Sequence, residues 1–121
     1  MIIIDTSAWV RFFRGLKDAA FVSDRIQDST AVLHPLVLGE LLLGGLSAQN
    51  ETLLRALSSL PTHPPERICQ FIKDNSLAGK GIGWVDAAIL CSAMEAGAAL
   101  ATFDEALLSC GRSLGLICRV G

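Results

Sequence analysis

Apolar residues fall along the chain in two patterns: short unbroken runs, and longer segments in which they recur at helical spacing. The first run, residues 1–4, is mostly β-branched, which is typical of a strand buried on both faces of a parallel sheet. The run ends at Asp5, and Thr6 and Ser7 can then cap a helix whose apolar positions follow directly.

The rest of the chain continues this alternation of strand and helix. The predicted elements are an amphipathic segment around 21–26, a strand at 30–34, helices at 36–46, at 51–60 and from 66, a loop at 77–83, a helix at 84–97, a strand at 98–103, a helix at 104–112 and a last short strand within 114–120. The alternation predicts an α/β fold in which a parallel sheet of about four to five strands is flanked by helices. A chain of 121 residues suits one domain, spanning 1–121.

Apolar residues also make up an unusually large share of the chain, 51%. The segment 36–46 is apolar on almost every side, so its helix should be covered on more than one side. We expect surplus apolar surface near Phe12, Phe13 and 41–46, covered by a partner or by a second copy in a dimer. No apolar stretch approaches the ~20 residues that cross a bilayer, and Asp5 comes too early for a signal peptide. We therefore expect a cytoplasmic protein that does not enter a membrane.

Neither the cysteines nor the histidines are spaced as metal ligands. The cysteines form no C-x-x-C pair and have no histidine at a zinc-site interval, so buried free thiols are expected. They are Cys69, Cys91, Cys110 and Cys118. His34 and His63 lie next to or near prolines, and we expect a structural role for both.

Two acidic residues follow apolar strands. Asp5 ends the strand at 1–4, and Asp104 comes directly after the strand that ends at Phe103. Each could simply cap the next helix. In one parallel sheet, however, two carboxylates at strand ends open onto the same edge, where open α/β sheets place their sites.

Two further acids are expected on helices. Glu40 has apolar neighbours on every side within 36–46, and a buried unpaired charge costs several kcal/mol, so it needs a cation, a metal or a surface position. Asp86 stands in the first turn of the helix at 84–97, a place that the helix dipole favours without any function.

Brought together, the four carboxylates would repel one another by about 4 kcal/mol per close pair at an effective dielectric of 20. A divalent metal removes this repulsion, and an all-oxygen set without His or Cys favours Mg²⁺ or Mn²⁺. Such a site suits hydrolysis of phosphodiesters. Thr6, Ser7 and Thr102 adjoin two of the acids and could hold a water or a phosphate, or act only as caps and strand residues. If four of the twelve acids lie in the site, eight acids remain against ten Lys and Arg in the rest of the chain. The remaining surface is then mildly basic, which permits a polyanionic substrate.

Four short motifs around these acids resemble the PIN-domain ribonucleases, and most closely the VapC-type toxins of bacterial toxin–antitoxin pairs. The motifs are Ile4-Asp5-Thr6-Ser7, Gly39-Glu40-Leu41, Gly83-Trp84-Val85-Asp86-Ala87 and Ala101-Thr102-Phe103-Asp104. The resemblance extends over nearly the whole chain. It implies a PIN-like three-layer α/β/α domain and a Mg²⁺- or Mn²⁺-dependent endoribonuclease that cleaves RNA. Such proteins are usually homodimers, each inhibited by a small antitoxin protein in a groove beside the site.

The resemblance also assigns roles to individual residues. The catalytic and metal-binding set is Asp5, Glu40, Asp86 and Asp104, supported by Thr6, Ser7 and Thr102. Glu40 is expected to bind the metal directly or through water, and no other cofactor is implied. The chain departs from the pattern at Phe103, where many relatives have a basic or polar residue directly before the last acid. The substrate contact that those relatives make there does not carry over.

Other interpretations of the same residues rank below the ribonuclease. An aspartyl phosphatase with Asp5 as its nucleophile would want a second acid where Ser7 stands. A receiver-like module would want paired acids after its first strand and a lysine later than Lys80. A non-catalytic partner-binding module would explain the apolar surplus but not the four carboxylates.

Four residues could contact RNA, but another role is favoured for each. Lys80 and Arg11 could bind phosphate, yet solvated surface charge is the preferred interpretation. Trp9 and Trp84 could stack on bases, but their helical spacing among apolar neighbours favours packing in the core.

Overall fold

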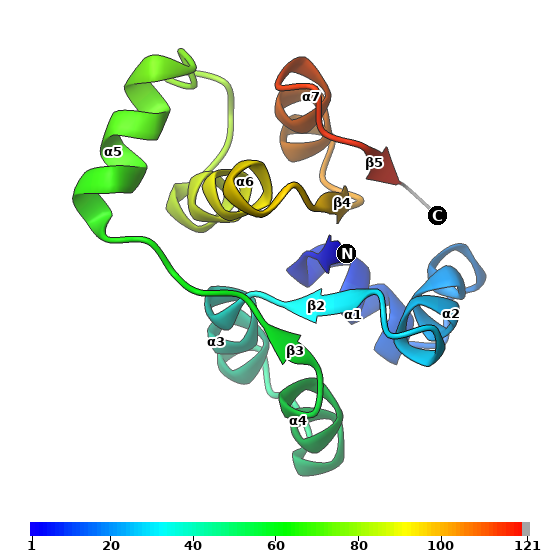
Figure 1. The fold of residues 1–121 in the computed structure, drawn as a ribbon. Coiled ribbons are helices and arrows are strands. Elements are labelled where there is room, and N and C mark those ends of the chain that lie inside the picture. The colour runs from blue at the N-terminus through cyan, green and yellow to red at the C-terminus, as the bar shows by residue number, and fades with distance from the viewer. Residues whose placement is uncertain (120–121) are drawn as a thin grey trace.

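Five short strands form one sheet in the computed structural model, which describes residues 1–119. All neighbouring strands are parallel, and the spatial order is β3-β2-β1-β4-β5 (Figure 1). The strands are β1 (Ile2–Ile4), β2 (Ala31–Leu33), β3 (Ser58–Ser59), β4 (Ala99–Ala101) and β5 (Cys118–Arg119). The predicted parallel α/β sheet is thereby confirmed.

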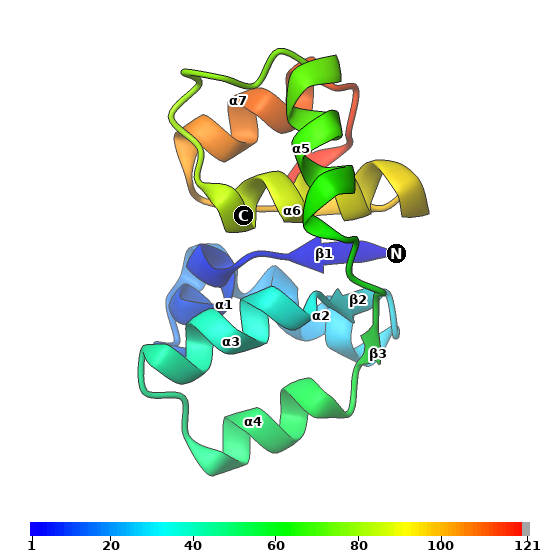
Figure 2. The same ribbon diagram turned by 90° about the vertical axis from the view of Figure 1, so that its left-hand side faces the viewer.

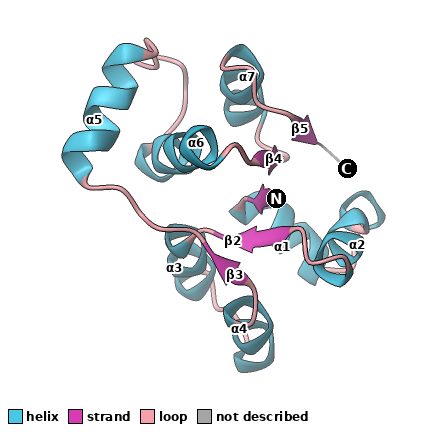
Figure 3. Ribbon diagram, in the orientation of Figure 1, coloured by secondary structure: helices cyan, strands magenta, loops and turns pink. Residues whose placement is uncertain are grey.

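Helices make up most of the described chain (Figure 3). They are α1 (Thr6–Phe13), the 3-10 turn η1 (Lys17–Ala19), α2 (Phe21–Gln27), α3 (Pro35–Leu43), α4 (Ala48–Arg55), α5 (Pro65–Asp74), α6 (Trp84–Ala96) and α7 (Glu105–Ser113). Within residues 1–119, none is long and apolar enough to cross a membrane.

The helices form two layers, one on each face of the sheet (Figure 2). The chain moves outward from β1 to β3 with α1–α4 on one face, then returns past β1 to β4 and β5 with α5–α7 on the other. Right-handed parallel crossovers require this change of face when the direction along the sheet reverses. The predicted three-layer arrangement is confirmed.

The core lies between the sheet and both helical layers. Ile3 on β1 and Leu100 on β4 are fully buried, as are Trp9 from α1 and Leu90 from α6. Because both faces of β1 are covered by helices, its sequence is an apolar run rather than an alternation. Trp9 stacks on Phe13, with ring centroids 5.5 Å apart, so the expectation that Trp9 packs in the core is confirmed.

Two predicted helices have different ends in the structure. The helix expected at 51–60 stops at Arg55, and Ser58–Ser59 instead pairs with β2 as an edge strand. The helix expected at 36–46 ends at Leu43, because Gly44 and Gly45 follow and Gly45 has a φ of 95°, which side-chain-bearing residues rarely adopt.

Helix α3 is covered on two sides, by α1 and by α4, as expected. Its inner positions are buried, but Leu43 is 91% exposed, so one side of this apolar helix faces solvent. The last predicted strand is present as Cys118–Arg119, and Val120 lies outside the described residues.

Candidate active site

Two of the predicted acids lie at the middle of the sheet's carboxyl edge. β1 and β4 pair in register, with Ile4 opposite Ala101, and the Asp5 N–H donates to the Ala101 carbonyl at 3.0 Å. Asp5 follows β1 directly, and Asp104 precedes α7 just beyond β4. The shared edge expected from the sequence is therefore present. Helix α6 also begins at this side of the sheet (Figure 2).

Asp5 is almost completely buried, with 4% of its surface exposed. Its Oδ1 accepts hydrogen bonds from Ser7 Oγ at 2.6 Å and from the Ala8 N–H at 3.1 Å, while its Oδ2 accepts one from Thr102 Oγ1 at 2.6 Å. Burial raises the pKa of Asp5, the three hydrogen bonds oppose that rise, and the negative charge of Asp86 adds to it. Asp5 is also the N-cap of α1, so the capping alternative and the site prediction describe the same geometry.

The hydroxyls of Ser7 and Thr102 connect Asp5 to the segment that carries Asp104. Ser7 Oγ accepts from the Phe103 N–H at 3.0 Å, and Thr102 Oγ1 accepts from the Asp104 N–H at 3.0 Å. Asp104 in turn caps α7, its Oδ1 accepting from the Leu107 N–H at 2.9 Å. The two hydroxyls thus fix Asp5 and Asp104 relative to each other.

Glu40 reaches the same region from α3. Its side chain is exposed, which agrees with the surface alternative, but Thr6 Oγ1 donates to its Oε1 at 2.6 Å and so ties α3 to the start of α1. Thr6, Ser7 and Thr102 therefore each hold one of the predicted site carboxylates.

Asp86 lies in the first turn of α6, where its Oδ2 accepts from the Gly83 N–H at 3.1 Å. Burial raises its pKa, the Gly83 bond counteracts this, and the negative charges of Asp104 and Glu40 raise it further. The charges of Asp104 and Glu40 raise the pKa of Asp86, and the charge of Asp86 raises the pKa of Asp5. The four carboxylates therefore share one electrostatic environment.

The carboxylates do not form a closed metal cage. Within residues 1–119, no three Asp, Glu, His or Cys side chains are arranged to hold one ion. The described hydrogen bonds occupy both oxygens of Asp5 but leave one oxygen without a protein donor on Glu40 (Oε2), Asp86 (Oδ1) and Asp104 (Oδ2).

Comparison with known proteins decides the family. The model of the PIN domain family matches residues 2–111. Ribonuclease VapC32 of Mycobacterium tuberculosis is 37% identical over 111 residues, which cover 88% of this chain and 87% of that protein. This chain is a PIN-domain protein of the VapC type. The family expected from the four motifs is therefore confirmed.

Solved structures show the same fold. The structure of VapBC-1 from nontypeable Haemophilus influenzae matches with a TM-score of 0.66 and 22% identity, covering 98% of this chain and 97% of that one. FitAcB from Neisseria gonorrhoeae matches with a TM-score of 0.65 and 18% identity, covering 98% and 96%.

One residue of this PIN-domain protein, Trp84, has a different environment from the predicted one, and another, Arg11, has contacts that the sequence did not reveal. Trp84, expected in the core, is 47% exposed, because it is the first residue of α6 after an open loop. Arg11 lies at the surface, as expected, but it also forms an ion pair with Asp18 and lies over the ring of Phe103, 4.9 Å from the ring centroid. A pairing across the turn between α1 and η1 leaves no periodic signal by which the sequence could reveal it. Lys80 is exposed, as expected.

A groove of about 370 Å³ adjoins the carboxylates and runs between α1, α3 and the start of α4. Thr6 and Glu40 form part of its lining. Its apolar side chains are Val10, Phe13, Leu41 and Leu46.

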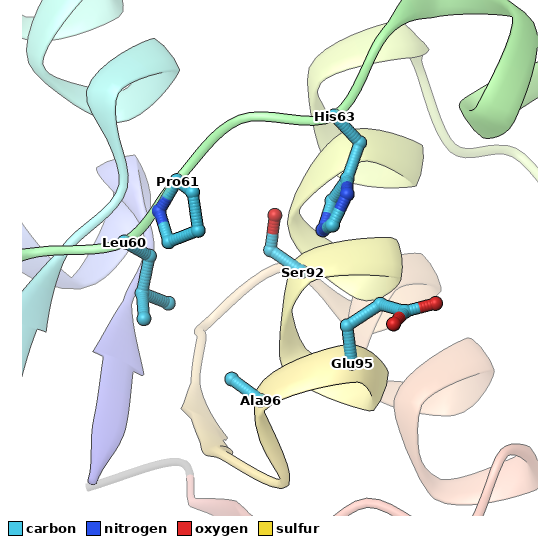
Figure 4. A pocket seen from close by; sticks show the side chains of 6 residues that line it. All are labelled: Leu60, Pro61, His63, Ser92, Glu95 and Ala96. Atoms are coloured by element: carbon cyan, nitrogen blue, oxygen red, sulfur yellow. The ribbon is translucent and has the colours of Figure 1, made fainter.

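His63 lines a small hollow of about 120 Å³ together with Ser92 of α6 (Figure 4). His34 follows β2 at the carboxyl edge of the sheet and is buried against the same serine. His34 caps α3 because its Nδ1 accepts from the Leu36 N–H at 3.2 Å, so the proton on Nε2 can be donated to Ser92 Oγ, 3.0 Å away. Burial, with a smaller effect of the neighbouring His63, lowers the pKa of His34 to about 4. The expected structural role of His34 is confirmed, and His63 points towards Ser92 across the hollow (Figure 4).

All four cysteines are free thiols, as expected. Cys91 and Cys110 are buried, whereas Cys69 is exposed and Cys118 is half-buried. The prediction that all four thiols are buried was wrong for Cys69. Cys69 is exposed because it lies on the face of α5 that points away from α6, against which the helix packs.

Proposed function

We propose that this PIN-domain protein is a Mg²⁺- or Mn²⁺-dependent endoribonuclease whose 121 residues form one domain. The catalytic set is Asp5, Glu40, Asp86 and Asp104. The observation that carries the proposal is the gathering of these acids at one edge of the sheet, where burial and, to a smaller extent, the charges of neighbouring acids raise the pKa of Asp5 and Asp86. Clustered acids held against their own repulsion are typical of functional sites. That a 37%-identical relative is a ribonuclease supports the same activity here.

The side chains fit a hard divalent cation, although no three of them are pre-arranged around one point in the described chain. The donors are all oxygens, and three of the acids have an oxygen without a protein donor. Mg²⁺ usually keeps several waters and takes only one or two carboxylates directly. Asp5, Asp86 and Asp104 would hold the cation, with Glu40 binding directly or through water. When bound, it would supply Lewis-acid activation of water and neutralise charge developing on the phosphate.

The protein's own groups orient the acids for this reaction. Ser7 and Thr102 favour the ionised form of Asp5, since both donate hydrogen bonds to it. Thr6 fixes one oxygen of Glu40 and leaves Oε2 open, either to bind the cation directly or to accept a proton from the water that attacks phosphorus. Attack of that water forms a new P–O bond and breaks the P–O bond to one ribose oxygen, which leaves and takes up a proton from solvent.

We further propose that the protein is the toxin of a toxin–antitoxin pair and acts as a homodimer. The VapC-type relationship supports an antitoxin protein as partner. The groove beside Glu40 offers apolar contacts for a segment of that antitoxin, and the exposed Leu43 lies on the same helix as Leu41 in the groove.

The decisive experiment is cleavage of a mixed RNA pool by purified protein with Mg²⁺, with Mn²⁺ and with EDTA, alongside the Asp5→Asn variant. We expect metal-dependent cutting that the variant loses while remaining folded, with equal or slightly higher stability because a like-charge repulsion is relieved. Wild-type turnover by Asp5→Asn would refute the assignment of the site. Absence of cutting by folded, antitoxin-free wild-type protein with either metal would refute the activity.

A further inference from the structure

The guanidinium of Arg11 lies at the rim of the carboxylate site. It stands over the ring of Phe103, 4.9 Å from the centroid, and Phe103 directly precedes Asp104. The Phe103 N–H donates to Ser7 Oγ at 3.0 Å, and Ser7 donates to Asp5 at 2.6 Å. Phe103 therefore links the Arg11 guanidinium to the hydrogen bonds that orient Asp5.

Asp18 holds the same guanidinium from a second side. Arg11 Nε donates to Oδ1 of Asp18 at 3.1 Å, and Nη2 donates to Oδ2. An arginine has five N–H donors, and this fork uses two of them. The other three have no protein acceptor among residues 1–119, and the Arg11 side chain is 38% exposed.

The remaining N–H donors of Arg11 could bind the RNA phosphates that the four acids repel. A carboxylate cluster repels the phosphates of RNA, so the chain needs a fixed cation close by to bind them. Guanidinium matches phosphate geometry with paired hydrogen bonds, and a half-exposed ion pair is weak enough for a phosphate to compete with Asp18. On the basis of the proposed function, we propose that Arg11 is a substrate-binding residue whose guanidinium binds an RNA phosphate next to the scissile one. Phe103 and Asp18 hold its side chain ready.

Kinetics separate this role from a purely structural one, in which Arg11 only fastens η1 to α1. With a defined RNA substrate taken from the pool assay, we expect Arg11→Gln to raise KM about tenfold and to change kcat by less than about threefold. The slope of log affinity against log salt should fall by about one. Asp18→Asn, which frees the guanidinium, should leave KM unchanged or lower it. Arg11→Lys keeps the charge but not the fork, so its KM should lie between those of Arg11→Gln and wild type.

A matched ion pair elsewhere supplies the control. Arg25 pairs with Asp28 at 3.0 Å with similar exposure, and Arg25 lines a hollow with Met1 and Thr30 at the amino ends of the strands, away from the carboxylates. Arg25→Gln makes the same change of charge and should alter KM less than about twofold, with a salt slope like that of wild type. Urea unfolding of every variant checks that each is folded.

Two outcomes would overturn the role of Arg11. One is wild-type KM and salt slope in Arg11→Gln while wild-type protein cleaves RNA, which leaves the proposed function standing. The other comes from binding of a labelled single-stranded RNA, measured by fluorescence anisotropy in the Asp5→Asn background. If adding Arg11→Gln does not weaken that binding, the role is wrong whether or not wild-type protein cleaves.

Discussion

Thr102 joins two of the proposed catalytic residues through one hydroxyl. It is fully buried, its Oγ1 donates to Asp5 Oδ2 at 2.6 Å, and the same oxygen accepts from the Asp104 N–H at 3.0 Å. Thr102→Val keeps the branched shape and removes the hydroxyl, whereas Thr102→Ser keeps the hydroxyl and removes a methyl group. The pair of variants separates hydrogen bonding from packing.

The magnitudes follow from these contacts. A hydrogen bond to a charged group contributes about 1.5–3 kcal/mol, and leaving the Asp104 N–H unpaired costs about 1–3 kcal/mol. A methyl group in place of the hydroxyl would also stand closer to Asp5 than the ~3.3 Å at which carbon and oxygen normally meet. We expect Thr102→Val to lower the free energy of unfolding by about 3 kcal/mol or more. Thr102→Ser should lose about 1 kcal/mol, the value of one buried methyl. For a chain of this size, 1 kcal/mol shifts the melting temperature by about 3–4 °C, so we expect decreases of about 10 °C and about 4 °C.

Urea and thermal unfolding in EDTA at neutral pH would measure these differences. A Thr102→Val protein within about 0.5 kcal/mol of Thr102→Ser would refute the reasoning, because the hydroxyl would then contribute nothing beyond its volume. Cleavage gives a second readout. The Thr102 hydrogen bond lowers the pKa of Asp5, so its loss should shift the acidic limb of the pH–rate profile towards higher pH in the Val variant and not in the Ser variant.

Four further predictions concern other parts of the molecule. The raised pKa of Asp86 means that the folded state holds a proton that the unfolded chain has already released, so stability without metal should fall as pH rises from the usual pKa of Asp through the higher folded value. Asp86→Asn should remove part of that fall in urea titrations in EDTA. The pKa of His34 is about 6.5 in the unfolded chain and is lowered to about 4 in the folded protein. The free energy of unfolding should therefore decrease as the pH falls from 6.5 towards 4. The loss should reach about 3 kcal/mol and should be absent in His34→Asn, which keeps a capping acceptor. Gly39→Ala should stabilise α3 by about 1 kcal/mol, since a Cβ there meets nothing within 4 Å, and thermal unfolding would measure this. Gly111→Ala should instead destabilise by about 1 kcal/mol or more, because its Cβ would lie 2.9 Å from Cys118 Sγ.

Local sequence signals predicted the centre of the sheet well. The apolar run before Asp5 and the rule that parallel strands share one carboxyl edge were enough to predict β1, β4 and the meeting of Asp5 with Asp104. The edge strand β3 was missed because Ser58-Ser59 has no strand signal of its own. Strand β3 forms because the folded chain brings Ser58-Ser59 beside β2, with which it pairs. The Leu60 N–H extends this pairing by donating to the Leu33 carbonyl at 2.9 Å.

Side-chain surroundings were less predictable than elements. Trp84 has apolar neighbours at helical spacing, but whether another element covers the first turn of its helix depends on the path of the preceding loop. The contact of Arg11 with Phe103 joins residues 92 positions apart, and the sequence places nothing between them that specifies it. Such contacts follow from the packing of α1 beside the turn after β4, which becomes visible only in the folded chain.

The competing interpretations of three acids, as helix caps or as site residues, turn out to be compatible. Asp5 and Asp104 cap α1 and α7, and Asp86 accepts the Gly83 N–H at the start of α6. Each cap contributes about 1 kcal/mol and fixes one carboxylate oxygen, which offsets part of the repulsion among the acids. Asn caps a helix about as well as Asp but carries no charge. Asp→Asn variants therefore keep the local structure and remove the chemistry, whereas Asp→Ala variants would confound a lost cap with a lost metal ligand.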